Sequence, residues 1–244
     1  MKAIEARGLT KRYGDVIAVN GLSFEVEQGE LFSLLGVNGA GKTTAIRMLT
    51  GLARPDAGDA LLMGRSLRED LRGVKKVVAV SPQESAVASR LTVSENLELV
   101  ARLHGASRAR ARERLEVALG RFGLSEVQKR RAGTLSGGWQ RRLSIAMALI
   151  SEPQVLFLDE PTLGLDVLAR RGLWKLIGEL KGETAILLTT HSMEEAEALS
   201  DRIGIMNGGR LAAVGTPGEL MTQAGATRFE DAFVALAAHG EVEQ

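Results

Sequence analysis

The sequence predicts an α/β fold in which helices cover both faces of a mostly parallel β-sheet. Three short segments are largely apolar and are expected to be strands, namely Glu30–Leu35, Val155–Leu158 and Thr184–Thr189. Apolar strands without polar alternation are typical of a parallel sheet that is buried on both faces. Segments with helical periodicity separate these strands along the chain, which is the order expected for such a sheet.

The N-terminal part of the chain is predicted to form an antiparallel β-subdomain. Strands are expected at Ala3–Arg7 and Leu22–Glu27, with a turn at Tyr13–Asp15 between them. A turn at Pro55–Gly58 and a strand at Ala60–Met63 follow. Later strands are expected at Val77–Val80 and in a hairpin whose turn is Asn207–Gly209, namely Ile203–Met206 and Leu211–Val214.

An inserted helical subdomain is expected at about 87–150. Within it Leu115, Leu119 and Phe122 recur at i, i+4 and i+7, as on one face of a helix. The helices expected there are Thr92–His104, Ser107–Phe122 and Gly138–Ile150. We therefore predict a single domain over 1–244, with its core at about 1–86 and 151–220 and a C-terminal helix at about 227–240.

Helices are also predicted outside this inserted segment. One begins near Gly41 and places Ile46, Leu49 and Leu52 on a single face. Two more are expected at Leu168–Leu180 and Met193–Leu199.

Composition and charge exclude several classes of function. The chain has 31 basic and 30 acidic residues, a balance that gives no reason to expect a nucleic-acid partner. It has no cysteine, which excludes disulfides, thiol catalysis and cysteine-based zinc sites. His104, His191 and His239 are too far apart in sequence to show metal-ligand spacing. The apolar runs are shorter than the roughly 20 residues of a membrane span, so we expect a cytoplasmic chain.

A glycine-rich segment between an apolar strand and a helix matches the phosphate-binding pattern G-x-x-x-x-G-K-[ST]. Its glycines let backbone N–H groups approach phosphate oxygens, and the helix N-terminus adds partial positive charge. Lys42 is expected to bind the β- and γ-phosphates of ATP, and the Thr43 hydroxyl to bind Mg²⁺. A glycine turn without a ligand is the alternative, but the strand and helix on either side favour a phosphate-binding loop. In this segment the chain resembles the P-loop nucleoside triphosphatases, which implies a core of the RecA-like type. The predicted loop and the residue after it are Gly36, Val37, Asn38, Gly39, Ala40, Gly41, Lys42, Thr43 and Thr44.

Two acids follow the apolar strand Val155–Leu158. Ligands gather at the carboxyl ends of parallel strands, so Asp159 is expected to face the Mg²⁺ directly or through water. Glu160 is the candidate general base for ATP hydrolysis, a role that contributes roughly 10²- to 10⁴-fold. Two surface acids in a turn are the alternative, which the phosphate loop elsewhere in the chain disfavours.

A second anion-binding segment precedes the helix expected after Gly138. Ser136 is expected to cap this helix, and Gly137 and Gly138 expose its N–H groups. With Leu135–Gly138 the chain resembles the ATP-binding cassette (ABC) ATPases, whose signature is Leu-Ser-Gly-Gly-Gln. One chain does not need two such sites for one γ-phosphate. The resemblance implies a head-to-tail dimer, with itself or with a related ABC subunit, that holds two ATP molecules between phosphate loop and signature.

The resemblance also implies residues that contact the adenine. Tyr13 matches the aromatic residue that stacks on the base, and Ala18 or Val19 should contact the base too. Without the family pattern, Tyr13 would be taken for a turn aromatic that packs locally.

Three other residues are implied near the γ-phosphate and the dimer interface. Gln83 matches the glutamine that touches Mg²⁺ and the attacking water, and its loop senses the membrane partner. His191 matches the histidine that contacts the γ-phosphate, and Asp166 belongs to the loop that crosses the dimer interface. Taken alone, an exposed glutamine and a lone histidine would be structural.

Two positions depart from the family pattern. Trp139 stands where the signature usually has glutamine, and Leu163 replaces a common serine in the cross-dimer loop. Neither change has a physical explanation in the sequence. The four arginines of Arg108–Arg114 lie beside Glu113 and Glu116, which favours a solvated helix face over a nucleic-acid patch.

The chain resembles in particular the stand-alone ATPase subunits of ABC exporters of the ABC-2 and drug-export type. The segments Leu91–Leu97 and Phe229–Phe233 carry this likeness, which favours export over import by analogy. It implies a separate integral-membrane permease as partner and a peripheral position on the inner face of the cell membrane. The alternative is a soluble single-cassette ATPase acting on ribosomes or iron–sulfur assembly. A chromosome-organising ATPase would need long heptad helices, for which 87–150 is too short.

Overall fold

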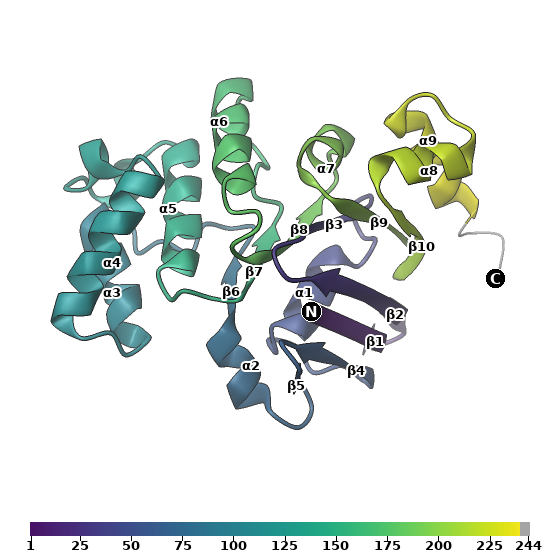
Figure 1. Cartoon of the computed structure of the whole chain (residues 1–244), viewed down its shortest axis with the longest axis horizontal. Coiled ribbons are helices and arrows are strands. Elements are labelled where there is room, and N and C mark those ends of the chain that lie inside the picture. The colour runs from purple at the N-terminus through teal and green to yellow at the C-terminus, as the bar shows by residue number, and fades with distance from the viewer. Residues whose placement is uncertain (240–244) are drawn as a thin grey trace.

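The computed structural model describes residues 1–239, and their strands form two sheets (Figure 1). Residue 240, the expected end of the C-terminal helix, lies outside the described residues. The four-stranded sheet contains β1 (Lys2–Tyr13), β2 (Val16–Glu27), β4 (Ala57–Leu62) and β5 (Arg65–Ser66). The six-stranded sheet contains β3 (Leu31–Leu35), β6 (Val78–Ser81), β7 (Val155–Asp159), β8 (Ala185–Thr190), β9 (Arg202–Asn207) and β10 (Arg210–Gly215).

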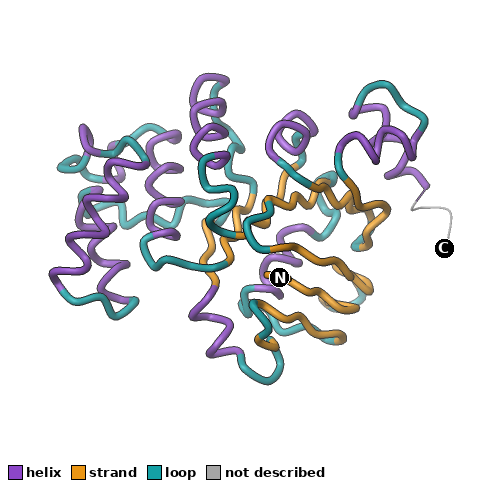
Figure 2. Tube along the Cα trace, in the orientation of Figure 1, coloured by secondary structure: helices purple, strands orange, loops and turns teal. Residues whose placement is uncertain are grey.

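Helices lie on both sides of the six-stranded sheet, as Figure 2 shows. Short 3-10 turns occur at Ser125–Val127 and Ala132–Thr134. The α-helices of the described residues are α1 (Lys42–Leu49), α2 (Leu71–Val77), α3 (Val93–Leu103), α4 (Arg108–Arg121), α5 (Gly137–Leu149), α6 (Val167–Gly178), α7 (Met193–Leu199), α8 (Pro217–Ala224) and α9 (Phe229–His239). The predicted α/β fold is therefore confirmed.

The order of the large sheet is β10-β9-β3-β8-β7-β6. In this order the three strands that are followed by predicted site residues, β3, β8 and β7, are neighbours. From β9 to β6 each neighbouring pair is parallel, and only β10 pairs antiparallel, with β9. β3, β8 and β7 are direct neighbours, so their carboxyl ends meet at one edge of the sheet. Ligands bind at that edge in open parallel sheets.

The strand β3 shows how the sheet is buried from both sides. Phe32 and Leu34 pack in one cluster with α1 and with β1 and β2 of the four-stranded sheet. Leu31, one residue out of phase, packs in a second cluster with α3 to α7. Alternate residues of a strand point to opposite faces, so the apolar residues of this five-residue strand contribute to both clusters.

Helices α3, α4 and α5 lie together at one end of the molecule, and α8 and α9 lie at the other (Figure 1). The caps explain where the first two begin. Thr92 and Glu95 form a capping box at the start of α3, and Ser107 caps α4 by accepting a hydrogen bond from Arg110 N at 3.2 Å. These helices occupy the expected helical segment, and the division of the chain into core and subdomain stays a prediction.

One predicted helix face is wrong. Leu52 was expected beside Ile46 and Leu49, but α1 ends at Leu49 and the Leu52 side chain is 71% exposed. The chain turns out of the helix at Gly51, whose φ is 69°.

The structure also contains short elements that periodicity does not predict, namely β5, α2 and α8. Their start signals are nevertheless present. Asp70 accepts a hydrogen bond from Gly73 N at 2.9 Å at the start of α2. Thr216 and Glu219 form a capping box around Pro217 at the start of α8. Caps therefore mark these helices better than their apolar pattern does.

Candidate nucleotide-binding site

The phosphate loop connects β3 to α1 and is held tightly by two neighbouring strands. A Cβ atom on Gly36 would lie 2.3 Å from the Met206 carbonyl oxygen of β9. A Cβ atom on Gly41 would lie 2.3 Å from the Ala18 carbonyl oxygen of β2, and Gly41 has φ of 99°. Only glycine fits such approaches, so the motif glycines are required by packing as well as by a ligand.

Lys42 begins α1 and folds its side chain back over the loop. Its Nζ donates to the carbonyl oxygens of Gly36 at 2.7 Å and Val37 at 3.1 Å. The same Nζ lies 3.3 Å from Glu160 Oε1, and Lys42 is 5% exposed. A buried ammonium group therefore stands at the base of the loop with both neutral and charged acceptors around it.

Thr43 and Asp159 meet at the floor of the site. Thr43 Oγ1 donates to Asp159 Oδ1 at 3.2 Å, and Thr189 Oγ1 donates to the same oxygen at 2.6 Å. These contacts bring α1, β7 and β8 together. Hydroxyl and carboxylate oxygens are the ligands that Mg²⁺ prefers, so this donor set fits the ion.

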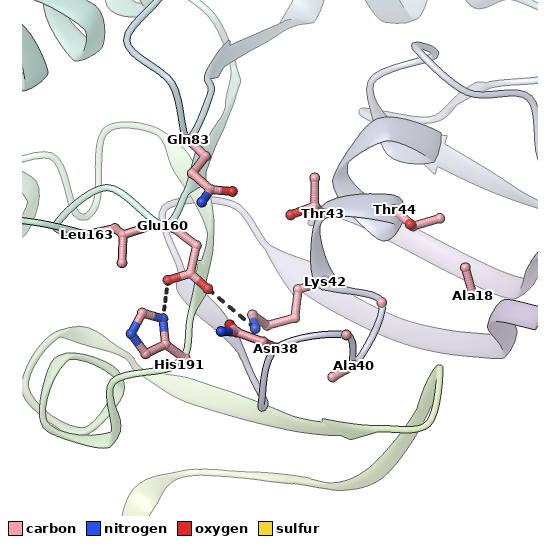
Figure 3. A pocket seen from close by; sticks show the side chains of 12 residues that line it. Ala18, Asn38, Ala40, Lys42, Thr43, Thr44, Gln83, Glu160, Leu163 and His191 are labelled. Atoms are coloured by element: carbon pink, nitrogen blue, oxygen red, sulfur yellow. Dashed lines mark hydrogen bonds and ion pairs between the residues drawn. The ribbon is translucent and has the colours of Figure 1, made fainter.

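Glu160 is buried and holds an unusual backbone conformation at the end of β7. Its φ is 47°, which for a residue with a side chain costs about 1–3 kcal/mol. Its N–H donates to the Thr189 carbonyl oxygen at 3.1 Å. Oε1 faces Lys42, and Oε2 lies 2.6 Å from His191 Nδ1 (Figure 3). The carboxylate thus lies between the phosphate-loop lysine and the histidine that follows β8.

Gln83 follows β6, and its main chain is fixed by a buried arginine of α5. Arg141 Nη1 donates to the Pro82 carbonyl oxygen at 2.8 Å, and Nη2 donates to the Gln83 carbonyl oxygen at 2.6 Å. Arg141 is 6% exposed. Burial lowers the pKa of its guanidinium, and the charge of Asp159 works against that change.

Several of these side chains line one pocket of about 440 Å³, whereas Asp159, Thr189 and Arg141 are not part of its lining. It contains most of the predicted loop together with Gln83, Glu160 and His191, and it contains Ala18 of β2. Leu163, 41% exposed, also lines the pocket. The lining residues are Ala18, Asn38, Gly39, Ala40, Gly41, Lys42, Thr43, Thr44, Gln83, Glu160, Leu163 and His191.

Two residues expected to contact the base are not part of this lining. Val19 is fully buried in the core between the sheets, so its side chain has no surface to offer a ligand in this structure. Tyr13 ends β1, is 48% exposed, and has Lys11 Nζ 5.5 Å from its ring centroid. Of the three residues expected at the adenine, the structure brings Ala18 to the pocket.

The signature residues do not line the pocket of their own chain. Ser136 occupies the N-cap position of α5, but its side chain makes no capping hydrogen bond, contrary to expectation. A Cβ atom on Gly138 would lie 3.1 Å from Ala169 Cβ, so the segment packs against the start of α6. Asp166 caps that helix, with Oδ1 accepting from Ala169 N at 2.9 Å.

Three residues with clear roles in this geometry were missed as site residues by the sequence analysis. Leu163 lines the pocket, Thr189 holds Asp159, and Arg141 holds the loop of Gln83. A polar Thr189 at the end of an apolar strand was a visible signal. No comparable signal was present for Arg141, because a helical pattern does not reveal a contact with Gln83, which is 58 residues away in sequence.

The fold and this glycine-rich loop define a P-loop nucleoside triphosphatase. The family model described as ABC transporter matches residues 19–163, and the chain belongs to this family. It is therefore an ATP-binding protein of the ABC ATPase type.

Comparison with known proteins agrees with this assignment. The chain is 45% identical over 231 residues to the doxorubicin resistance ATP-binding protein DrrA of Mycobacterium tuberculosis, covering 93% of this chain and 70% of that protein. It is 46% identical to the Nod factor export ATP-binding protein I of Burkholderia orbicola, over 89% of this chain and 72% of that protein. A solved ATP-binding subunit of an ABC transporter superposes with a TM-score of 0.85 at 31% identity, over 96% of this chain and 99% of that one.

Among residues 1–239, no helix combines the length and the apolar character that crossing a bilayer requires.

Proposed function

We propose that this chain is the ATP-hydrolysing subunit of an ABC exporter and works with a separate membrane permease. The observation that carries the proposal is the contact of Glu160 with both Lys42 and His191 at the phosphate loop. Similarity to proteins named for drug resistance and Nod factor export supports export as the direction. The chain would then lie on the cytoplasmic face of the membrane, held there by its permease.

The residues around Asp159 would hold Mg²⁺ bound to the nucleotide. Thr43 and Asp159 supply oxygen ligands that already share a hydrogen bond, and Gln83 lines the same pocket. When bound, the ion would neutralise negative charge on the β- and γ-phosphates. Lys42 would add a point charge, exchanging its loop carbonyl partners for phosphate oxygens.

Glu160 would act as the general base. It is buried, so its carboxylate is shielded from bulk water and held in one orientation by its backbone and by His191. In that role it would accept the proton of the water that attacks the γ-phosphorus. His191, which is 44% exposed at its side chain, would hold Glu160 on one side and contact the γ-phosphate on the other.

A second copy, or a related ABC subunit, would complete the site. Ser136, Gly137 and Gly138 do not line the pocket of their own chain, and they lie at a helix N-terminus suited to an anion. In a head-to-tail pair this segment would reach the γ-phosphate held by the partner, and the Asp166 loop would lie at the interface. Tyr13 would stack on the adenine beside Ala18, and Val19 would support Ala18 from the core.

Substitution of the base tests the proposal. Glu160→Gln is expected to retain ATP binding and to lower turnover by about 10²- to 10⁴-fold. Phosphate release and ATP affinity are measured on the same preparation, with exposed Glu116→Gln of α4 as the control. Because hydrolysis would reopen the dimer, this variant should also accumulate a dimer with ATP in size-exclusion chromatography. Wild-type turnover in Glu160→Gln would remove Glu160 from the role of base.

A further inference from the structure

A buried carboxyl group lies behind the catalytic edge of the sheet and is not used in the chemistry described above. Glu195 of α7 has 0% exposure. Its Oε1 accepts hydrogen bonds from Thr162 Oγ1 at 2.8 Å and from Trp174 Nε1 at 3.0 Å. Among residues 1–239, its Oε2 has no hydrogen-bond partner. A buried polar side chain with one unpartnered atom is uncommon and calls for an explanation.

The surroundings of Glu195 favour its neutral form. No lysine, arginine or histidine of the described residues forms an ion pair with it. Burial is the main cause that raises the pKa of Glu195. Side-chain hydrogen bonding by Thr190, Thr162 and Trp174 opposes the rise, and the nearby charge of Glu160 adds a smaller contribution to it. Burying an ionised carboxylate without a cation costs far more free energy than burying a protonated one.

The partners of this carboxyl group connect the two segments that carry the catalytic pair. Thr162 lies two residues after Glu160, in a turn where Leu163 N donates to the Glu160 carbonyl oxygen at 3.2 Å. Glu195 lies four residues after His191, and its N–H donates to Ser192 Oγ at 3.3 Å at the start of α7. Trp174 adds α6 as a third element.

We propose that Glu195 is a positioning residue, whose buried carboxyl group fixes the Thr162 turn against α7 and so holds Glu160 at hydrogen-bond distance from His191. It does not line the pocket, and its hydrogen bonds go to Thr162, Trp174 and Ser192 instead of to the phosphate loop. Its loss should therefore act on the chemical step and leave ATP binding nearly unchanged. This proposal depends on the proposed role of Glu160.

Steady-state ATP hydrolysis by the full chain tests it. Glu195→Ala is expected to lower kcat by roughly 10- to 100-fold, the scale of a displaced catalytic group. The KM and the measured affinity for ATP should stay within about threefold of wild type, because an effect confined to the chemical step appears in kcat. Glu195→Gln, which is neutral and keeps an oxygen acceptor for Thr162 and Trp174, should restore kcat to within about threefold. Exposed Glu197→Ala on the same helix is the matched control.

Two shape-conserving variants keep the proposal testable if Glu195→Ala does not fold. Thr162→Val and Trp174→Phe each remove one donor to Oε1. Thr162→Val should lower kcat more than Trp174→Phe does, since Thr162 belongs to the turn that follows Glu160. Wild-type kcat in Thr162→Val, or a Glu195→Gln as slow as Glu195→Ala, overturns the proposal.

Measuring Glu160→Gln in parallel separates the two levels of inference. If Glu160→Gln is inactive while Glu195→Ala and Thr162→Val keep wild-type kcat, only the positioning role fails. If Glu160→Gln itself hydrolyses ATP at the wild-type rate, the proposed function of the site fails first.

Discussion

The phosphate loop and the signature segment both lie at helix N-termini, but they differ in the contacts that they make within the chain. The phosphate loop is closed in by β2 and β9, and its Lys42 has three acceptors within 3.3 Å. Ser136 of the signature segment makes no capping hydrogen bond, and the segment rests on the start of α6 instead of on the pocket. The residues of the phosphate loop are thus held in place within a single chain. In the proposed head-to-tail pair, the signature segment would instead bind a nucleotide held by the second chain.

The largest effect, a loss of ATP affinity, is expected from a substitution in the phosphate loop. Lys42→Ala should weaken ATP binding by about 10- to 100-fold, because it removes charged hydrogen bonds to phosphate. Isothermal titration calorimetry measures the affinity, and exposed Lys175→Ala of α6 serves as the control. The variant also leaves Glu160 without its cation, so a melting curve should accompany the titration. Unchanged affinity would refute the role given to Lys42.

A smaller effect is expected from a substitution in the signature segment, and it should appear in the turnover rate instead of in ATP affinity. Ser136→Glu places a negative charge where a γ-phosphate of the partner would bind, and should lower turnover at least about tenfold. ATP affinity of the single chain should not change, since Ser136 is outside its pocket. Added to Glu160→Gln, it should also prevent accumulation of the dimer with ATP. Ser125→Glu, at an exposed position, is the control, and a loss of affinity in Ser136→Glu would contradict the two-chain site.

The smallest effect on turnover is expected from Arg141, which connects α5 to the loop of Gln83 through hydrogen bonds. Arg141→Met keeps the bulk but removes both donors to the Pro82 and Gln83 carbonyl oxygens, and should slow turnover about three- to tenfold. Its neighbour Arg142 lies 5.1 Å from the Trp139 ring, and Arg142→Met should cost only about 0.5–1 kcal/mol of stability. Turnover and melting temperature distinguish the two variants. Equal turnover in both would show that Arg141 does not position Gln83.

Much of the fold was predictable because its signals are local. The helix predicted at Met193–Leu199 has those bounds in the structure. Of the turn predicted at Tyr13–Asp15, Gly14 and Asp15 lie between β1 and β2, and Tyr13 ends β1. The errors arise where tertiary contacts override a pattern. Leu52 continued a helical face, but the chain turns at Gly51. Of Ala18 and Val19, either of which was expected at the base, Ala18 lines the pocket, and the packing of β2 against β1 and α1 buries Val19.

The sequence alone determined the chemical nature of the phosphate loop, because a strand, a glycine turn, a lysine and a helix start are contiguous and their requirements are local. It also identified Asp159 and Glu160 as acids at a strand end. Only the tertiary structure decided that Glu160 lies between Lys42 and His191, that Arg141 holds the Gln83 loop, and that Glu195 is buried without a cation. Those contacts join residues that are far apart in sequence, and the order of β3, β8 and β7 in the sheet brings them together.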